Sequence, residues 1–172
     1  QAEADYLSEV IEQYKSGRNN GLKYRIVRRA AHNTDAEVAS LISTLATEPD
    51  IDPVQKSLAF EFLCLNHTFI SYIAALGAHR EKIEDQDILN LLDKALENIR
   101  GALLRDEMPD LSAQNMIPHI RQRLAQDQEQ DQKSLIILQQ LSLMFSILKQ
   151  LSQLKQSLSH ERDEQATELG SL

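Results

Sequence analysis

Basic side chains recur at helical spacing in one short segment of the chain. Residues three and four apart share a helix face, and four such residues form one stripe: Arg25, Arg28, Arg29 and His32. Lys23 and the three arginines make this segment positive, whereas the whole chain has a net charge of −8. Such a stripe can bind anionic phospholipid headgroups, an anionic ligand or an acidic partner surface. It can equally be a salt-bridged face that pairs with the acidic segment 81–110 of the same chain.

The residue types that usually carry catalysis or bind metal do not occur at the required spacing. The 5 histidines lie on different segments, and no Glu has a His three residues later, as a di-iron helical bundle requires. Gly-x-Ser-x-Gly, Walker and Gly-x-Gly-x-x-Gly patterns are also absent from the sequence. We therefore expect no enzyme activity, no metal and no cofactor.

The single cysteine lies three residues before a histidine in an apolar part of the sequence. Cys64 and His67 can touch on one helical turn, as a nucleophile and its base must. A hydrogen bond inside a helical core explains this spacing more simply, and we expect Cys64 to be a buried, inert thiol. We expect Asn66 and His67 to make a polar contact between helices.

The segment 53–80 is apolar on nearly every side of a helix. Such a helix is normally buried among other helices or placed in lipid. Glu61, Asn66 and His67 interrupt the run, and its apolar pieces are shorter than the roughly 20 residues that cross a bilayer. We therefore predict that it is the central helix of a soluble bundle and that no run in this sequence spans a membrane.

The composition and the apolar periodicity predict an all-α protein. Hydrophobic residues make up 42% of the chain, with only 5 Gly and 4 Pro. Besides 53–80, we expect helices over 2–16, 22–47, 85–106 and 131–159. The segment 112–125 is either a shorter helix or an irregular segment, because Pro118 interrupts its pattern. They should form an antiparallel bundle of five or six helices, as one domain over 1–160, followed by a polar, frayed tail over 161–172.

Two of these helices have apolar rows that we expect to face the core. On the second helix the predicted inner side is Ile26, Ala30, Val38, Leu41, Ile42 and Leu45. On the last helix a row at alternating spacings of four and three packs against antiparallel neighbours or a second copy of the chain. The residues of this row are Ile137, Leu141, Met144, Leu148, Leu151 and Leu158. We favour packing within the chain, because further apolar residues widen the row: Ile136, Leu143, Ile147 and Leu154.

Two strings of the sequence carry a family resemblance. YRIVRRAAHNTDAEVASLISTLATEP (24–49) resembles the pattern Y-R-x-x-R-R-x-A-H-N-x-D-A, closing on E-P, and FEFLCLNHTFISYIAALGAHR (60–80) resembles F-x-F-L-x-L-x-H-T-x-x-S-Y-x-x-A-L-G-A-H-R. Together they are similar to the C-terminal cytoplasmic region of the YccS/YhfK branch of the fusaric acid resistance (FUSC) family. The close match covers residues 24–80, and the rest of the chain matches only as a helical bundle.

The resemblance implies a location and a role. FUSC proteins are bacterial inner-membrane proteins with two sets of membrane helices, each followed by a cytoplasmic region, and some relatives export aromatic carboxylic acids. The chain is then a soluble domain on the cytoplasmic face of the inner membrane that assembles or regulates the membrane part of a transporter. The opening Gln, in place of Met, also fits a piece of a longer protein.

The resemblance also implies partners and site residues. The expected partners are the protein's own membrane domain, a second copy, an anionic phospholipid surface or an aromatic acid, and the negative net charge argues against nucleic acid. The family motifs map onto a candidate polar network or anion site: Arg25, Arg28, Arg29, His32, Asn33, Asp35, His67, His79 and Arg80. The alternative function is a sensing module that binds an anionic aromatic compound at Arg28, Arg29 and His32.

Overall fold

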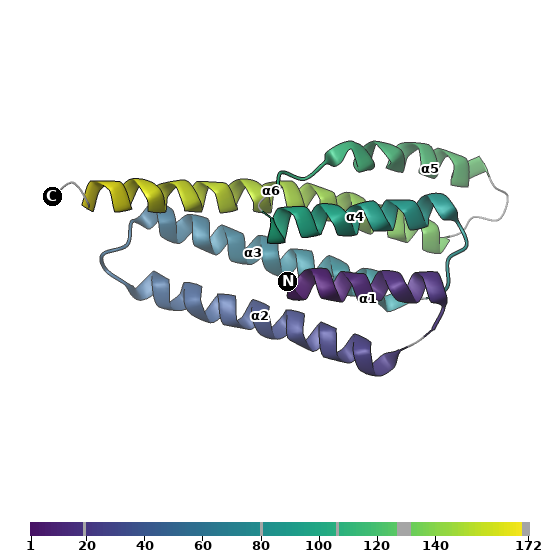
Figure 1. Cartoon of the computed structure of the whole chain (residues 1–172), viewed down its shortest axis with the longest axis horizontal. Coiled ribbons are helices and arrows are strands. Elements are labelled where there is room, and N and C mark those ends of the chain that lie inside the picture. The colour runs from purple at the N-terminus through teal and green to yellow at the C-terminus, as the bar shows by residue number, and fades with distance from the viewer. Residues whose placement is uncertain (19, 80, 106, 127–131, 170–172) are drawn as a thin grey trace.

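The computed structural model confirms an all-α bundle and contains no strand in the residues that it describes, which are 1–18, 20–79, 81–105, 107–126 and 132–169. Successive long helices run antiparallel (Figure 1). Two short 3-10 turns, Gly77–His79 and Leu111–Asn115, lie beside the α-helices. The helices are α1 (Ala2–Ser16), α2 (Gly21–Thr47), α3 (Pro53–Leu76), α4 (Gln86–Leu104), α5 (Met116–Gln126) and α6 (Gln132–Leu169).

Local capping chemistry explains where these helices begin and end. Gly17 ends α1 in the left-handed region at φ 65°, a conformation that glycine adopts without the clash of a Cβ. The side chain of Asp52 accepts from the backbone N–H of Val54 at 2.9 Å, directly before the proline that opens α3. Asp85 caps α4, as the sequence predicted, by accepting from the N–H groups of Asp87 and Ile88.

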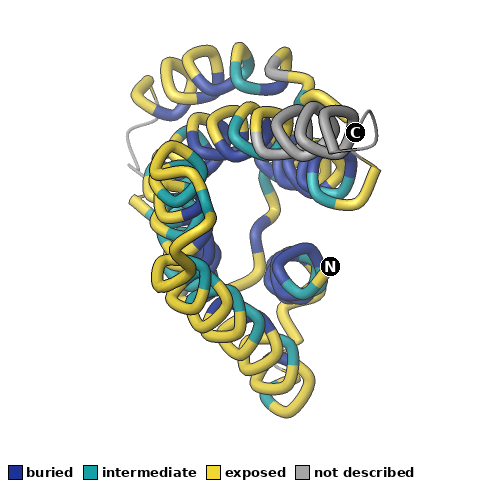
Figure 2. Tube along the Cα trace, turned by 90° about the vertical axis from the view of Figure 1, so that its left-hand side faces the viewer, coloured by how far each residue is buried: buried dark blue, intermediate teal, exposed yellow. Residues whose placement is uncertain are grey.

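The helix buried most completely is α1. Nine of its 15 residues are buried, and it packs against α2, α3 and α4. The Tyr14 hydroxyl donates to the carbonyl of Leu76 at 2.5 Å, and the Tyr6 and Tyr24 hydroxyls lie 3.0 Å apart. In Figure 2, α1 is mainly dark blue and lies within the arc of the other helices.

The prediction that α3 is buried on every side is wrong for its first half. The second half is buried at Phe69, Ile70, Ile73 and Leu76, where α6, α2 and α1 pack on it. The first half has fewer neighbours, and Phe60 is 60% exposed. Sequence alone did not indicate this, because an all-round apolar helix looks the same whether its partners lie within the chain or elsewhere.

The two ends of the bundle differ. At one end α2, α3 and α6 extend beyond α1, α4 and α5 (Figure 1). Large apolar side chains are open to solvent at this end: Leu41 is 71% exposed and Val54 is 55% exposed, in addition to Phe60. We call Leu41, Val54 and Phe60 the open apolar end.

The predicted inner side of α2 is wrong at Ile26, Ala30 and Leu41, which are exposed. The observed inner row contains the buried Tyr24, Ala31 and Asp35 and continues through the half-buried Val38, Ile42 and Leu45, which were predicted to face inward. α2 is an outer helix that packs against α1 and α3, and Figure 2 shows its outward side in yellow.

α6 follows the predicted seam but is longer than expected. Ile137, Leu141, Met144, Leu148 and Leu151 are buried, and α6 packs against α3, α4 and α5 of the same chain. The helix continues past the predicted end at residue 159 as far as Leu169. The frayed tail expected over 161–172 stays a prediction. Residues 170–172 and the Leu158 side chain lie outside the described part of the chain.

Within the described residues, two helical stretches are long and apolar enough to cross a membrane by length and composition. They are Pro53–Leu76 and Gln132–Ser157, each of which contains an 18-residue window with a mean hydropathy of 1.3. The prediction that no run is long and apolar enough to span a membrane is therefore wrong by this measure. The few polar residues in each stretch do not lower the mean hydropathy of the window enough to exclude it. Core helices of water-soluble proteins meet the same criterion, and both stretches are partly buried inside the bundle.

Candidate functional site

A buried carboxylate joins α2 to α3. Asp35 is only 7% exposed, on the inner row of α2. Its Oδ1 accepts from Asn66 Nδ2 at 2.8 Å, and its Oδ2 lies 2.7 Å from His67 Nδ1. Asn66 is 6% exposed, whereas the His67 side chain is 65% exposed. We call Asp35, Asn66 and His67 the Asp35 network.

The Asp35 network has a structural role that follows from its burial. A buried carboxylate needs hydrogen-bond donors, and both donors come from neighbouring positions on α3. Sliding α2 by one residue along α3 would separate the carboxylate from them, so the network fixes the register of the two helices. Asp35 and His67 were predicted to share one polar network, and Asn66 was predicted to make an interhelical contact with no particular partner.

The basic stripe does not join this network. Arg25, Arg28, Arg29, His32 and Asn33 are all exposed on α2. Arg25 Nε donates to the carbonyl of Gly21 at 3.1 Å, one turn earlier in the same helix. Within the described part of the chain, Arg28, Arg29 and His32 have no ion-pair or hydrogen-bond partner.

The alternative that this stripe pairs with the acidic segment 81–110 is wrong for the described residues, because those acids bind other bases. Lys15 pairs with Asp93 at 2.7 Å, and Lys133 pairs with Glu81 at 2.8 Å. Arg123 binds Asp85 and Asp87, and Arg105 binds Glu97 and Glu107. The arginines of α2 are therefore left facing solvent.

Lys23 differs from the arginines that follow it. Its Nζ lies 2.6 Å from Oε2 of Glu9, a residue that is only 3% exposed on α1. The hydrogen bond and the charge of Glu9 raise the pKa of Lys23 above its ordinary value. Gln13 donates to the other oxygen of Glu9 at 3.1 Å, so this group of residues holds α1 against α2.

Of the remaining predicted positions, some differ from the prediction and others lie outside the described residues. Cys64 is exposed, so the prediction of a buried thiol is wrong. His67 bonds Asp35 and not the cysteine. His79 ends the 3-10 turn after α3, while its side chain and the whole of Arg80 lie outside the described residues.

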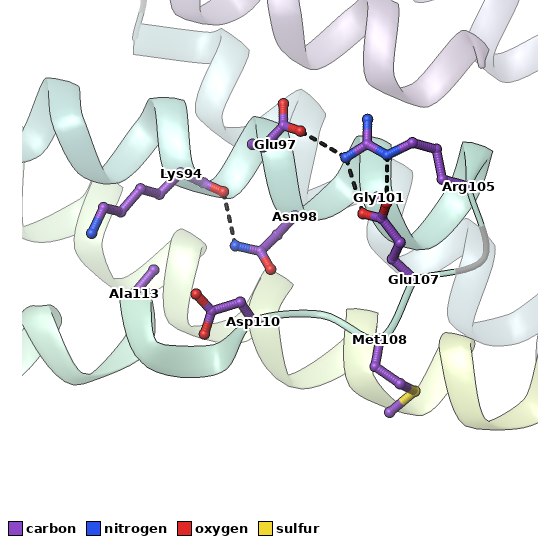
Figure 3. Close-up of a pocket in the computed structure, with 9 residues that line it drawn as sticks. All are labelled: Lys94, Glu97, Asn98, Gly101, Arg105, Glu107, Met108, Asp110 and Ala113. Atoms are coloured by element: carbon purple, nitrogen blue, oxygen red, sulfur yellow. Dashed lines mark hydrogen bonds and ion pairs between the residues drawn. The ribbon is translucent and has the colours of Figure 1, made fainter.

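A shallow hollow of about 250 Å³ lies where the end of α4 meets the segment leading to α5 (Figure 3). The guanidinium of Arg105, which lines this hollow, is bound by neighbouring carboxylates. It donates to Glu97 at 2.7 Å and to Glu107 at 2.9 Å. Arg105 holds the pKa of Glu107 below its usual value. The carboxylate of Asp110 accepts hydrogen bonds from the N–H and the hydroxyl of Ser112. The carboxylates of Glu107 and Asp110 in this hollow are therefore already bound by neighbouring side chains or backbone.

The fold and the site define an all-α module whose helices are stabilised by apolar packing and by polar contacts between them. In the residues that the structure describes, no cluster of side chains could bind a metal ion. The chain is 39% identical over 160 residues to the inner membrane protein YccS of Escherichia coli (strain K12), an alignment that covers 92% of this chain and 22% of YccS. It is also 37% identical over 84 residues to an uncharacterized protein of Haemophilus influenzae, covering 49% of this chain and 12% of that protein. The chain therefore corresponds to a region of a YccS-type membrane protein.

The chain spans about a fifth of the length of YccS (22%) and 12% of the length of the Haemophilus influenzae protein. No family model matches the chain, so the FUSC label stays a prediction. No solved structure matches it either.

Proposed function

We propose that the chain is a cytoplasmic helical domain of a YccS-type inner-membrane transporter and that it assembles or regulates the membrane part. The observation that carries this proposal is the open apolar end. Leu41, Val54 and Phe60 are more than half exposed on α2 and α3, and large apolar side chains left open to water mark surfaces of protein contact. The partner is the remainder of the same protein, which is several times longer than this region in YccS.

Packing supports a bundle in water over a pair of membrane-crossing helices. α3 contains the two donors that bind the buried Asp35 of α2, and α2 has Arg25, Arg28 and Arg29 exposed. Crossing a bilayer would separate these groups or take Asp35 into hydrocarbon, where an ionisable side chain is costly. The exposed first half of α3 is then a surface for protein contact.

The assembly role is tested by comparing the same substitutions in two settings. Leu41→Ser with Phe60→Ser should leave the unfolding free energy of the 172-residue chain within about 0.5 kcal/mol, because both side chains are already exposed. In the full-length protein the paired change should lower the melting temperature or dissociate the oligomer in detergent. Leu104→Ser is the matched control, since Leu104 is 43% exposed at the end of α4. A full-length protein that behaves the same with either change would contradict the assembly role.

The sensing module remains the alternative from a different class. The exposure of Arg28, Arg29 and His32 favours a surface contact over an enclosed site for an aromatic acid. Thermal-shift measurements with aromatic carboxylates, repeated with Arg28→Ala and Arg29→Ala, separate the two functions. Stabilisation by an acid that disappears in both variants would favour sensing.

A further inference from the structure

We propose that the outward face of the first half of α2 binds the anionic surface of a lipid bilayer. This inference goes beyond the assembly role, because it concerns other residues on another part of the molecule. The residues of this face, which we call the basic apolar face, are Leu22, Arg25, Ile26, Arg28 and Arg29.

The first argument is the exposure of two large apolar side chains one helical turn apart. Leu22 is 64% exposed and Ile26 is 58% exposed, and their spacing of four places them side by side on the helix. The packed side of α2 at this level is formed by Tyr24 and Ala31, which point the other way. The two side chains therefore belong to no core within the described residues.

The second argument is the charge around them. Residues 16–34 contain five lysine and arginine residues and no acidic residue, in a chain whose net charge is −8. Only Lys23 among the five has a carboxylate partner in the described residues. The positive charge of Arg25, Arg28 and Arg29 is thus available to an external anion, although the chain as a whole would repel one.

The third argument is the shape that results. α2 is the outermost helix on its side of the bundle, with its exposed residues turned away from α1 and α3 (Figure 2). A convex helix that presents Leu and Ile between arginines matches a surface offering phosphate groups and hydrocarbon together. An enclosed small anion or a purely acidic protein surface would give Leu22 and Ile26 no apolar contact. A bilayer of anionic phospholipid satisfies both kinds of side chain.

The test measures co-sedimentation of the 172-residue chain with vesicles. One vesicle is phosphatidylcholine alone, and the other is phosphatidylcholine mixed with phosphatidylglycerol. The chain should bind the mixed vesicle, and added salt should weaken binding because it screens the arginines. Arg25→Gln, Arg28→Gln and Arg29→Gln together should weaken binding on the order of 100-fold, since each basic residue near an anionic surface contributes about fivefold.

Two further variants separate the parts of the face. Leu22→Ser with Ile26→Ser should also weaken binding to the mixed vesicle, while circular dichroism confirms that the helices are retained. Arg121→Gln with Lys149→Gln is the matched control, because both side chains are exposed on other helices. This pair of changes should alter the affinity for the mixed vesicle by less than about threefold.

Three results would overturn the proposal. They are no binding to the mixed vesicle, equal binding to both vesicles, and equally tight binding with the three arginines replaced. Light scattering supplies one more outcome: a dimer that the arginine changes dissociate, with vesicle binding unaltered, would assign the face to a second copy of the chain. None of these results bears on the open apolar end, so the assembly role stands or falls separately.

Discussion

Removing the carboxylate of Asp35 should destabilise the bundle more than any change to its partners. Asp35→Ala takes away the acceptor of two hydrogen bonds, at 2.8 Å from Asn66 and 2.7 Å from His67. It also leaves the amide of Asn66, which is 6% exposed, without an acceptor in a dry position. A hydrogen bond to a charged group contributes about 1.5–3 kcal/mol, and a stranded buried donor costs about 1–3 kcal/mol.

The net loss is smaller than the sum of these values, because removing a buried carboxylate also relieves its own desolvation. We expect Asp35→Ala to lower the unfolding free energy by about 3 kcal/mol. For a chain of this size the melting temperature should fall by about 6–12 °C. Urea and thermal unfolding followed by circular dichroism at 222 nm, a wavelength at which helices absorb, would measure both.

The partners provide an internal ranking. Asn66→Ala should cost about 1–2 kcal/mol, because Asp35 keeps one of its two donors. His67→Ala should cost about 1 kcal/mol or less, since its side chain is 65% exposed and exposed pairs contribute little. Asp35→Ala with Asn66→Ala should cost less than the sum of the two single changes, as expected for groups in contact. The reasoning is refuted if Asp35→Ala stays within about 0.5 kcal/mol of the unsubstituted chain, or if His67→Ala costs as much.

Three other predictions follow from packing and charge. Gly77→Ala should destabilise by about 1–3 kcal/mol, because a Cβ there would lie 2.7 Å from the Tyr24 hydroxyl, and Tyr24→Phe should recover part of that loss in chemical denaturation. Phe69→Ala should cost about 3–5 kcal/mol, whereas Phe60→Ala should change the same unfolding free energy by less than about 0.5 kcal/mol; equal losses would contradict the observed burial. Hydrogen bonds from the N–H of Ser112 and then from its hydroxyl lower the pKa of Asp110. The ionised carboxylate therefore stabilises the fold at pH values above its ordinary pKa. This stabilisation is lost as the pH falls through the lowered pKa of the folded chain. The gap in melting temperature between the unsubstituted chain and Asp110→Asn should accordingly close in acid; a gap that is constant with pH would show that the cap does not titrate.

Local features of the fold were predictable, because they depend on neighbours in sequence. Asp85 caps α4, and the proline at position 53 opens α3, since a short side chain or a fixed φ acts within a few residues. The polar residues inside the apolar run of α3 also indicated a partner on another helix, and Asp35 is that partner.

Features that depend on the presence of a neighbour were harder to predict. α2 has apolar residues on two sides, and periodicity alone did not decide whether Ile26 or Tyr24 faces inward. Covering one side was enough to stabilise the helix, so Leu22, Ile26 and Leu41 stayed exposed. Cys64 was misplaced for the same reason, because the sequence does not tell whether the partners of an apolar helix belong to the same chain.

The same cysteine offers the most direct test of where this region lies. Cys64 is near the middle of Pro53–Leu76 and is exposed on the bundle. In full-length protein whose other cysteines are replaced, a membrane-impermeant maleimide is added to inside-out and to right-side-out inner-membrane vesicles. Urea is then added without detergent, to open any protein contact that covers the thiol.

A cytoplasmic bundle predicts that Cys64 reacts in inside-out vesicles, at the latest after urea, and stays unlabelled in right-side-out vesicles. A thiol that reacts on neither side, and only after detergent dissolves the bilayer, would place α3 in the membrane and contradict the account. Reaction from the outer side alone would contradict it as well.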